Sequence, residues 1–185
     1  MNRDEVIAIL DEHVKTDRLR KHLAGVEAVM RAYARQHGED EELWGNAGLL
    51  HDFDWDICPT PEQHPMFGAE LLRSQGVPEE LVRAVLSHGD HNDVTRDNLM
   101  EKVLYAVDEL SGFITAVTLV RPNKSLGEVN AGAVRKKMKD KSFARSVRRE
   151  DITQGAEALG LDLDAHIEFV VESLKPIADQ LGVNP

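Results

Sequence analysis

The chain has 185 residues and a mass of 20.7 kDa, a size typical of a single folded domain. Hydrophobic residues make up 42% and charged residues 30%, which excludes a disordered or collagen-like chain and leaves too much charge for a membrane protein. The net charge of −11 argues against a general binder of nucleic acid or of anionic membranes, because such proteins present a basic surface.

Cysteine content and apolar runs indicate the compartment. Cys58 is the only cysteine, which excludes an internal disulfide or a four-cysteine zinc site. The amino terminus has only a short apolar run, Val6 to Leu10, unlike a signal peptide. Nowhere do about 18 apolar residues follow one another, as a membrane span requires. We therefore expect a cytoplasmic protein.

Apolar residues recur at helical spacing, and no segment shows the period-two alternation of a strand, so we predict an all-α fold. The first helix is expected to begin behind Asp4 as its N-cap. A second runs from about Asp17 to Gln36, with Gly38 ending it. The third begins in the carboxylate-rich turn GEDEE and ends in His51-Asp52.

The rest of the chain also divides at its prolines and glycines. Residues 54–65 hold three prolines and are predicted to form a loop. After this loop we expect one helix that begins near Met66 and a second that begins at Pro78. A third is expected from Asn98 to about Thr118, followed by two more around 151–159 and 164–181.

Five features with ligand-type side chains stand out in chain order: His22, His51-Asp52, His64, His88 with His91, and Asp108. Asp108 lies in an apolar helix, where an unpaired buried carboxylate is costly and needs a cation or strong donors. A metal ion removes this cost, because imidazole nitrogens and carboxylate oxygens suit zinc, manganese and iron. Facing helices of a bundle are known places for such sites.

The order His22, His51-Asp52, Asp108 resembles the H…HD…D signature of the HD superfamily of metal-dependent phosphohydrolases. The stretches AGLLHDFDWD, HPMFGAELL, VLSH and LYAVDELSGFITA are similar to its HDIG-type branch. The resemblance implies a helical bundle with a metal site between core helices. It also implies one HD domain over residues 1–185, with a core of about 15–120 and a C-terminal helical extension of about 121–181.

Carried over by position, the resemblance assigns His22, His51, Asp52 and Asp108 to a first metal ion. Dinuclear relatives add two histidines between the HD pair and the last aspartate, which here implies His64 and His88, with Asp52 as the bridge. One or two divalent ions of Fe, Mn, Ni, Co, Zn or Mg are expected.

Alternatives remain for individual histidines. His91 competes for the second metal or contacts substrate, and His64 is alternatively an exposed loop residue. The remaining three histidines, His13, His37 and His166, match no position of the signature and are expected at the surface.

Two departures from the family pattern bear on catalysis. Trp55 stands where many relatives have a substrate-contacting lysine or glutamate. Asp54 or Asp56 beside it is a substitute acid or base, or the segment is a solvated turn with Trp55 as a lid or packing anchor. Gly89 follows His88 where relatives that hydrolyse cyclic dinucleotides have a second histidine, which argues against that activity. The predicted catalytic residues are Asp52, His91 and Asp54.

The segment from Arg121 to Arg149 has ten lysine and arginine residues and two acidic ones, a local balance of +8 that leaves −19 for the rest. It is either a solvated helix face or a source of phosphate donors, since guanidinium groups match phosphate geometry. The substrate contacts predicted on the second interpretation are Lys124, Arg145 and Arg149.

The expected function is hydrolysis of a small phosphate ester or nucleotide by a metal-activated water. The expected partner is a small phosphorylated substrate, with no nucleic-acid polymer and no membrane, and a homo-oligomer is left open. Two alternatives stand beside it: a di-iron oxygenase of the HD type, and a non-catalytic nucleotide- or metabolite-binding HD module.

Overall fold

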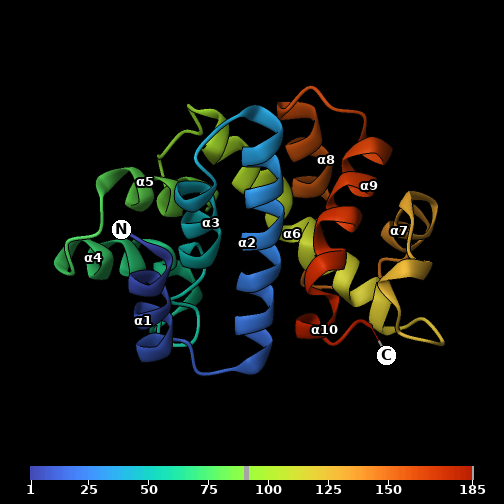
Figure 1. Cartoon of the computed structure of the whole chain (residues 1–185), viewed down its shortest axis with the longest axis horizontal. Coiled ribbons are helices and arrows are strands. Elements are labelled where there is room, and N and C mark those ends of the chain that lie inside the picture. Colours follow the sequence, from blue (N-terminus) through green and yellow to red (C-terminus); the bar gives the residue numbers. More distant parts are fainter. Residues whose placement is uncertain (90–91, 185) are drawn as a thin grey trace. The chain divides into compact units, whose positions relative to one another are not determined.

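The computed structural model describes residues 1–89 and 92–184, and all regular structure in these residues is helical (Figure 1). The all-α prediction is confirmed. The chain forms two compact units, Met1–Tyr105 and Ala106–Pro185, and α6 (Leu99–Leu119) runs unbroken through the boundary between them. The division into a core ending near 120 and an extension stays a prediction.

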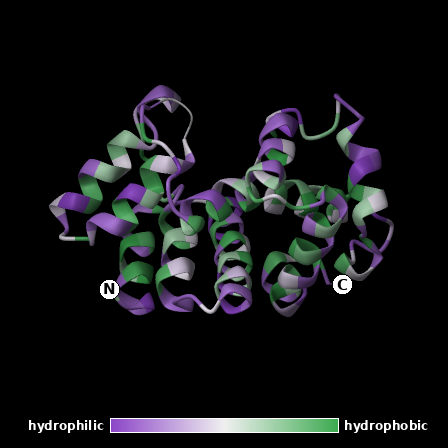
Figure 2. Cartoon of the chain, turned by 90° about the horizontal axis from the view of Figure 1, so that it is seen from above, coloured by the Kyte–Doolittle hydropathy of each residue, from purple (hydrophilic) through white to green (hydrophobic). Residues whose placement is uncertain are grey.

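In its described residues, the amino-terminal unit holds five complete helices, one 3-10 turn and the start of α6. These elements are α1 (Arg3–His13), α2 (Asp17–His37), α3 (Glu41–Leu50), η1 (Pro61–Gln63), α4 (Met66–Ser74) and α5 (Glu79–His88). Figure 2 shows hydrophilic and hydrophobic residues alternating along these helices, as amphipathic packing requires. No helix of the described residues is apolar over a length that would cross a membrane.

Helix ends largely follow the predicted signals. Gly38 ends α2 in the left-handed region with φ 71°, which glycine adopts without strain. Asp40 caps α3 through the amides of Glu42 and Leu43. The expected N-cap at Asp4 is wrong: Asn2 caps α1 in a reciprocal pair with Glu5, and Asp4 lies in the first turn.

α2 and α3 form a hairpin that sets the spacing of the site residues (Figure 1). Leu23 and Val26 of α2 and Ala47 and Leu50 of α3 are all fully buried. Gly48 makes this approach possible, because a Cβ at that position would lie 3.0 Å from the Cα and the amide nitrogen of Glu27. The close contact brings the carboxyl end of α3 beside the amino-terminal half of α2.

The proline-rich segment after α3 is a series of turns, as predicted, and the helices beyond it begin as expected. α4 begins at Met66 and α5 begins after Pro78. Leu72 of α4 and Leu81, Val82 and Val85 of α5 are fully buried or nearly so. This packing fixes the carboxyl end of α5, where His88 lies.

The carboxy-terminal unit holds the end of α6 and the elements η2 (Leu126–Glu128), α7 (Ala131–Met138), α8 (Arg149–Ala158), α9 (Leu163–Leu174), η3 (Lys175–Ile177) and α10 (Ala178–Leu181). The helix predicted over 164–181 is interrupted at Lys175-Pro176, because proline lacks the amide needed to continue it. His166, expected at the surface, is instead buried with its Nε2 3.1 Å from the carbonyl oxygen of Ala106.

Replacing Gly48 by alanine is expected to lower the free energy of unfolding by about 1–3 kcal/mol, because the new methyl group meets backbone that has no room to move. Gly132→Ala in α7 is the matched control, since nothing except the Asn130 side chain lies within 4 Å and alanine favours a helix by up to about 1 kcal/mol. Urea unfolding followed by circular dichroism measures both. Equal shifts for the two variants would contradict the close approach of α3 to α2.

Candidate metal centre

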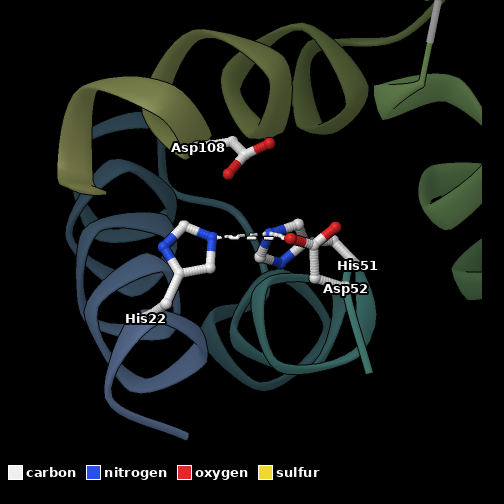
Figure 3. A group of neighbouring side chains, drawn as sticks. All are labelled: His22, His51, Asp52 and Asp108. Carbon is white, nitrogen blue, oxygen red and sulfur yellow. Dashed lines mark hydrogen bonds and ion pairs between the residues drawn. The ribbon is translucent and has the colours of Figure 1, made fainter. Parts of the chain in front are cut away.

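The first group of ligand-type side chains is His22, His51, Asp52 and Asp108, and one ligand atom of each lies within 4.8 Å of all the others. They come from α2, from the end of α3 and from α6, and they point toward one another (Figure 3). The Nε2 atoms of His22 and His51 are 3.1 Å apart. Oδ2 of Asp52 lies 3.8 Å from the first and 3.6 Å from the second.

The second group is Asp52, His64 and His88. Here the other carboxylate oxygen is used: Oδ1 of Asp52 lies 3.0 Å from Nε2 of His64 and 3.2 Å from Nε2 of His88. These two imidazole nitrogens are 3.1 Å apart. Asp52 therefore belongs to both groups and turns one oxygen toward each, the arrangement that a carboxylate bridging two cations requires.

Backbone carbonyls fix the tautomers of two of these histidines. Nδ1 of His51 lies 2.8 Å from the carbonyl oxygen of Gly48, and Nδ1 of His88 lies 2.5 Å from that of Val85. Because a carbonyl oxygen only accepts, each Nδ1 carries the proton and each Nε2 presents a lone pair to the cluster. Both rings are oriented as metal ligands by the turn that precedes them.

Asp54 orients His64 in the same way. Its side chain is fully buried, with Oδ1 accepting from Nδ1 of His64 at 2.8 Å and Oδ2 accepting from the amide of Gly68 at 2.9 Å. A Cβ at position 68 would lie 2.7 Å from the carboxylate carbon, so this approach needs glycine. This placement behind His64 suits a positioning residue, and the proton-transfer role of Asp54 stays a prediction.

The second group lacks a donor once these tautomers are set. Nε2 of His64, Nε2 of His88 and Oδ1 of Asp52 are then three acceptors within about hydrogen-bond distance, and they repel unless a cation lies among them. Burial lowers the pKa of His64, but hydrogen bonds with Asp52 and Asp54 outweigh it and raise the pKa to about 9. The site therefore favours a positive charge, which a proton or a divalent metal ion can supply.

The same surroundings keep the bridging carboxylate ionised. Burial raises the pKa of Asp52, but positive charge at His51 and hydrogen-bond donors at His64 and His88 outweigh it and hold the pKa well below its usual range. A bound metal ion would take over this role when the imidazoles are its neutral ligands. An ionised carboxylate between imidazole nitrogens is the donor set expected for first-row divalent ions. The residues therefore fit one or two such ions.

The structure also bears on the other site residues that the sequence predicted. The alternative of His64 as an exposed loop residue is wrong, since the side chain is buried. His91 lies outside the described residues. Lys124 and Arg145 are exposed, and their substrate role stays a prediction.

Arg149 is engaged in local structure. Its guanidinium donates to the carbonyl oxygens of Ala144 at 2.6 Å and Val147 at 2.5 Å and lies 4.8 Å from the ring centre of Phe113. These contacts hold the turn that precedes α8. A phosphate contact by Arg149 therefore stays a prediction that must compete with these hydrogen bonds.

Asp54 and Gly68 were not predicted as a positioning pair from the sequence. They are 14 residues apart and on different elements, so no local pattern links them. The sequence feature that points to their proximity is the proline-rich loop between them, because a chain reversal in that loop brings α4 back toward His51-Asp52.

The sequence is similar to a known protein family and to several curated proteins. A family model described as HD domain matches residues 19–112. Ribonuclease Y of Oleidesulfovibrio alaskensis is 30% identical over 93 residues, which are 50% of this chain and 18% of that protein. Ribonuclease Y of Cutibacterium acnes is 30% identical over 105 residues, 56% of this chain and 17% of that protein.

A third relative, ribonuclease Y of Frankia alni, is 34% identical over 92 residues, 49% of this chain and 12% of that protein. The match therefore covers less than a fifth of the length of each of these relatives. No solved structure matches the chain.

The purified protein is expected to bind two divalent ions per chain, and elemental analysis after dialysis against manganese or zinc measures this. His64→Ala should retain one ion, whereas Asp52→Ala should weaken both sites because both groups share its carboxylate. His37→Ala, an exposed histidine outside both groups, serves as the control and should keep two. A wild-type protein with one ion, or a His64→Ala variant with two, would contradict the second site.

Asp54→Asn is expected to weaken binding of the second ion by about 10- to 100-fold, the usual effect of losing the partner that orients a ligand histidine. If the amide oxygen keeps the Gly68 hydrogen bond, the amide nitrogen faces Nδ1 of His64 and moves the proton onto Nε2. Titration with cobalt against a chelator measures the affinity. Asp56→Asn is the matched control, since that carboxylate contacts Lys15 and Thr16 instead; equal losses in both variants would exclude the positioning role.

Proposed function

Because this chain belongs to the HD domain family, we propose that it is a metal-dependent phosphohydrolase that acts on a small phosphate ester or nucleotide. The observation that carries the proposal is the pair of ligand groups that share Asp52, one on each carboxylate oxygen. HD domain proteins bind divalent metals, and the His and Asp side chains of this chain fit them.

Divalent ions in such a site supply Lewis acidity and an activated water for attack on phosphorus. The protein's contribution is geometry. Asp52 sets the spacing of the two metal positions. Hydrogen bonds from Nδ1 of His51, His88 and His64 hold these rings in their ligand tautomers, with Gly48, Val85 and Asp54 as the respective acceptors. Residues fixed in this way need no rearrangement as the reaction proceeds, which is the main advantage of a preorganised site.

Charge favours a phosphate substrate. The ligand set contains two carboxylates, Asp52 and Asp108, and otherwise neutral imidazoles. Two carboxylates do not neutralise two divalent ions, so a loaded site stays cationic within a chain whose net charge is −11. A small anion is drawn to this local charge.

The same net charge supports a small substrate over a nucleic-acid polymer. The relatives are named ribonucleases, which makes a phosphodiester of RNA the second substrate class to test. A polymer, however, meets the surface outside the site, and the acidic balance of this chain disfavours that contact. The match to these relatives includes little of their length, so their polymer binding need not extend to this chain.

The test is a panel of phosphomonoesters, phosphodiesters, nucleotides and a short single-stranded RNA, with manganese, iron, cobalt, nickel or magnesium added. We expect metal-dependent release of phosphate or of a nucleotide from at least one small ester, and loss of turnover to background in Asp52→Ala. Asp11→Ala, which removes an exposed carboxylate of a surface ion pair, is the control and should keep wild-type turnover. Absence of turnover by protein shown to hold its metal would overturn the proposal, and cleavage of RNA alone would replace its substrate class.

A further inference from the structure

Trp55 is exposed in an unusual place. The residue is 45% exposed, whereas the other tryptophan, Trp44, is 3% exposed in the core. Single exposed apolar side chains are common and need no explanation by themselves. What distinguishes Trp55 is its position three residues after the bridging carboxylate.

Both the backbone and the ring of Trp55 contact the candidate metal centre. The amide of Trp55 donates to the carbonyl oxygen of Asp52 at 2.9 Å, in the turn that follows α3. The indole lies edge to face with the ring of His64, with 4.9 Å between ring centroids and 83° between their planes. The indole is thus anchored by its contact with His64 beside the second ligand group, while the residue as a whole stays exposed.

The segment around Trp55 is held from both sides. Asp54 is tied to His64 and Gly68, and its carbonyl oxygen accepts from the amides of Ile57 and Cys58. Oδ2 of Asp56 accepts from the backbone amides of Lys15 at 2.8 Å and Thr16 at 2.7 Å. The indole is therefore presented by a fixed turn, and neither neighbouring carboxylate covers it, since both are committed elsewhere.

We propose that Trp55 is a stacking platform for the base of a nucleotide whose phosphate lies at the metal centre. This inference rests on the proposed function, and it narrows the substrate from phosphate esters in general to those that carry an aromatic base. A mononucleotide matches the two neighbouring features, because its phosphate is drawn to the cationic site and its base has a flat π-face for the indole. Stacking of this kind tolerates all four bases, since every base has such a face.

The binding test compares adenosine 5′-monophosphate with ribose 5-phosphate, which keeps the sugar and the phosphate and lacks the base. Trp44→Phe leaves Trp55 as the only indole, so its fluorescence reports on position 55 alone. With zinc-loaded protein, which avoids quenching by a paramagnetic ion, saturable quenching is expected with the nucleotide and none with ribose 5-phosphate. Calorimetry on the Trp44-containing protein gives the same comparison if the Trp44→Phe core is destabilised.

Two substitutions separate stacking from apolar contact. Trp55→Leu keeps an apolar side chain without a ring and is expected to weaken nucleotide binding by about 5- to 150-fold, the loss measured for one stacked base. Trp55→Phe keeps a ring and should retain most of the affinity. Neither change should alter the affinity for ribose 5-phosphate. Equal affinity of the wild-type protein for the two ligands, or unchanged nucleotide binding by Trp55→Leu, would overturn the platform.

The outcomes also separate this inference from the proposed function. Hydrolysis of nucleotide and ribose phosphate alike, with no dependence on Trp55, would reject the platform and leave the phosphohydrolase standing. Saturable quenching by the nucleotide, lost in Trp55→Leu, supports the platform even where no ester is hydrolysed.

Discussion

The carboxylate of Asp52 is the group on which the rest of the site depends. One oxygen faces His22 and His51, and the other faces His64 and His88. An ionised carboxylate in such a place is stable only among positive charges or hydrogen-bond donors, and the surrounding imidazoles hold the pKa of Asp52 well below its usual range. A pair of divalent ions would meet the same electrostatic demand.

The scaffold supports this one group through short and inflexible contacts. Gly48 serves twice, since its missing side chain lets α3 approach α2 and its carbonyl oxygen holds His51. Gly68 similarly admits Asp54, which then holds His64. Glycine lets two segments of backbone or a side chain pack closely, and a hydrogen bond at Nδ1 orients each ring whose Nε2 faces the metal centre. Both fix a ligand side chain without adding bulk.

The site favours cations locally, whereas the chain as a whole is acidic. The net charge of −11 discourages long anionic polymers, whereas the ligand set attracts a small anion once it holds metal. Trp55 adds an apolar surface beside this charge. A charged phosphate next to a flat apolar ring is the chemical character of a nucleotide, which is why the two proposals support each other while remaining separately testable.

The sequence alone determined the helical class, most helix boundaries and the order of ligand residues, because each depends on local patterns. Helical periodicity, Gly38 and Pro78 act within a few residues of where they stand, and the HD pair with His22 and Asp108 is recognisable by order. The tertiary structure decided what depends on long-range contacts. It buried His64 and His166, paired Asp54 with a histidine ten residues away, and turned the Arg149 guanidinium onto neighbouring backbone carbonyl oxygens. The first three depend on chain reversals that bring distant residues together. The contacts of Arg149 depend on the conformation of the turn that precedes α8, which helical periodicity does not predict.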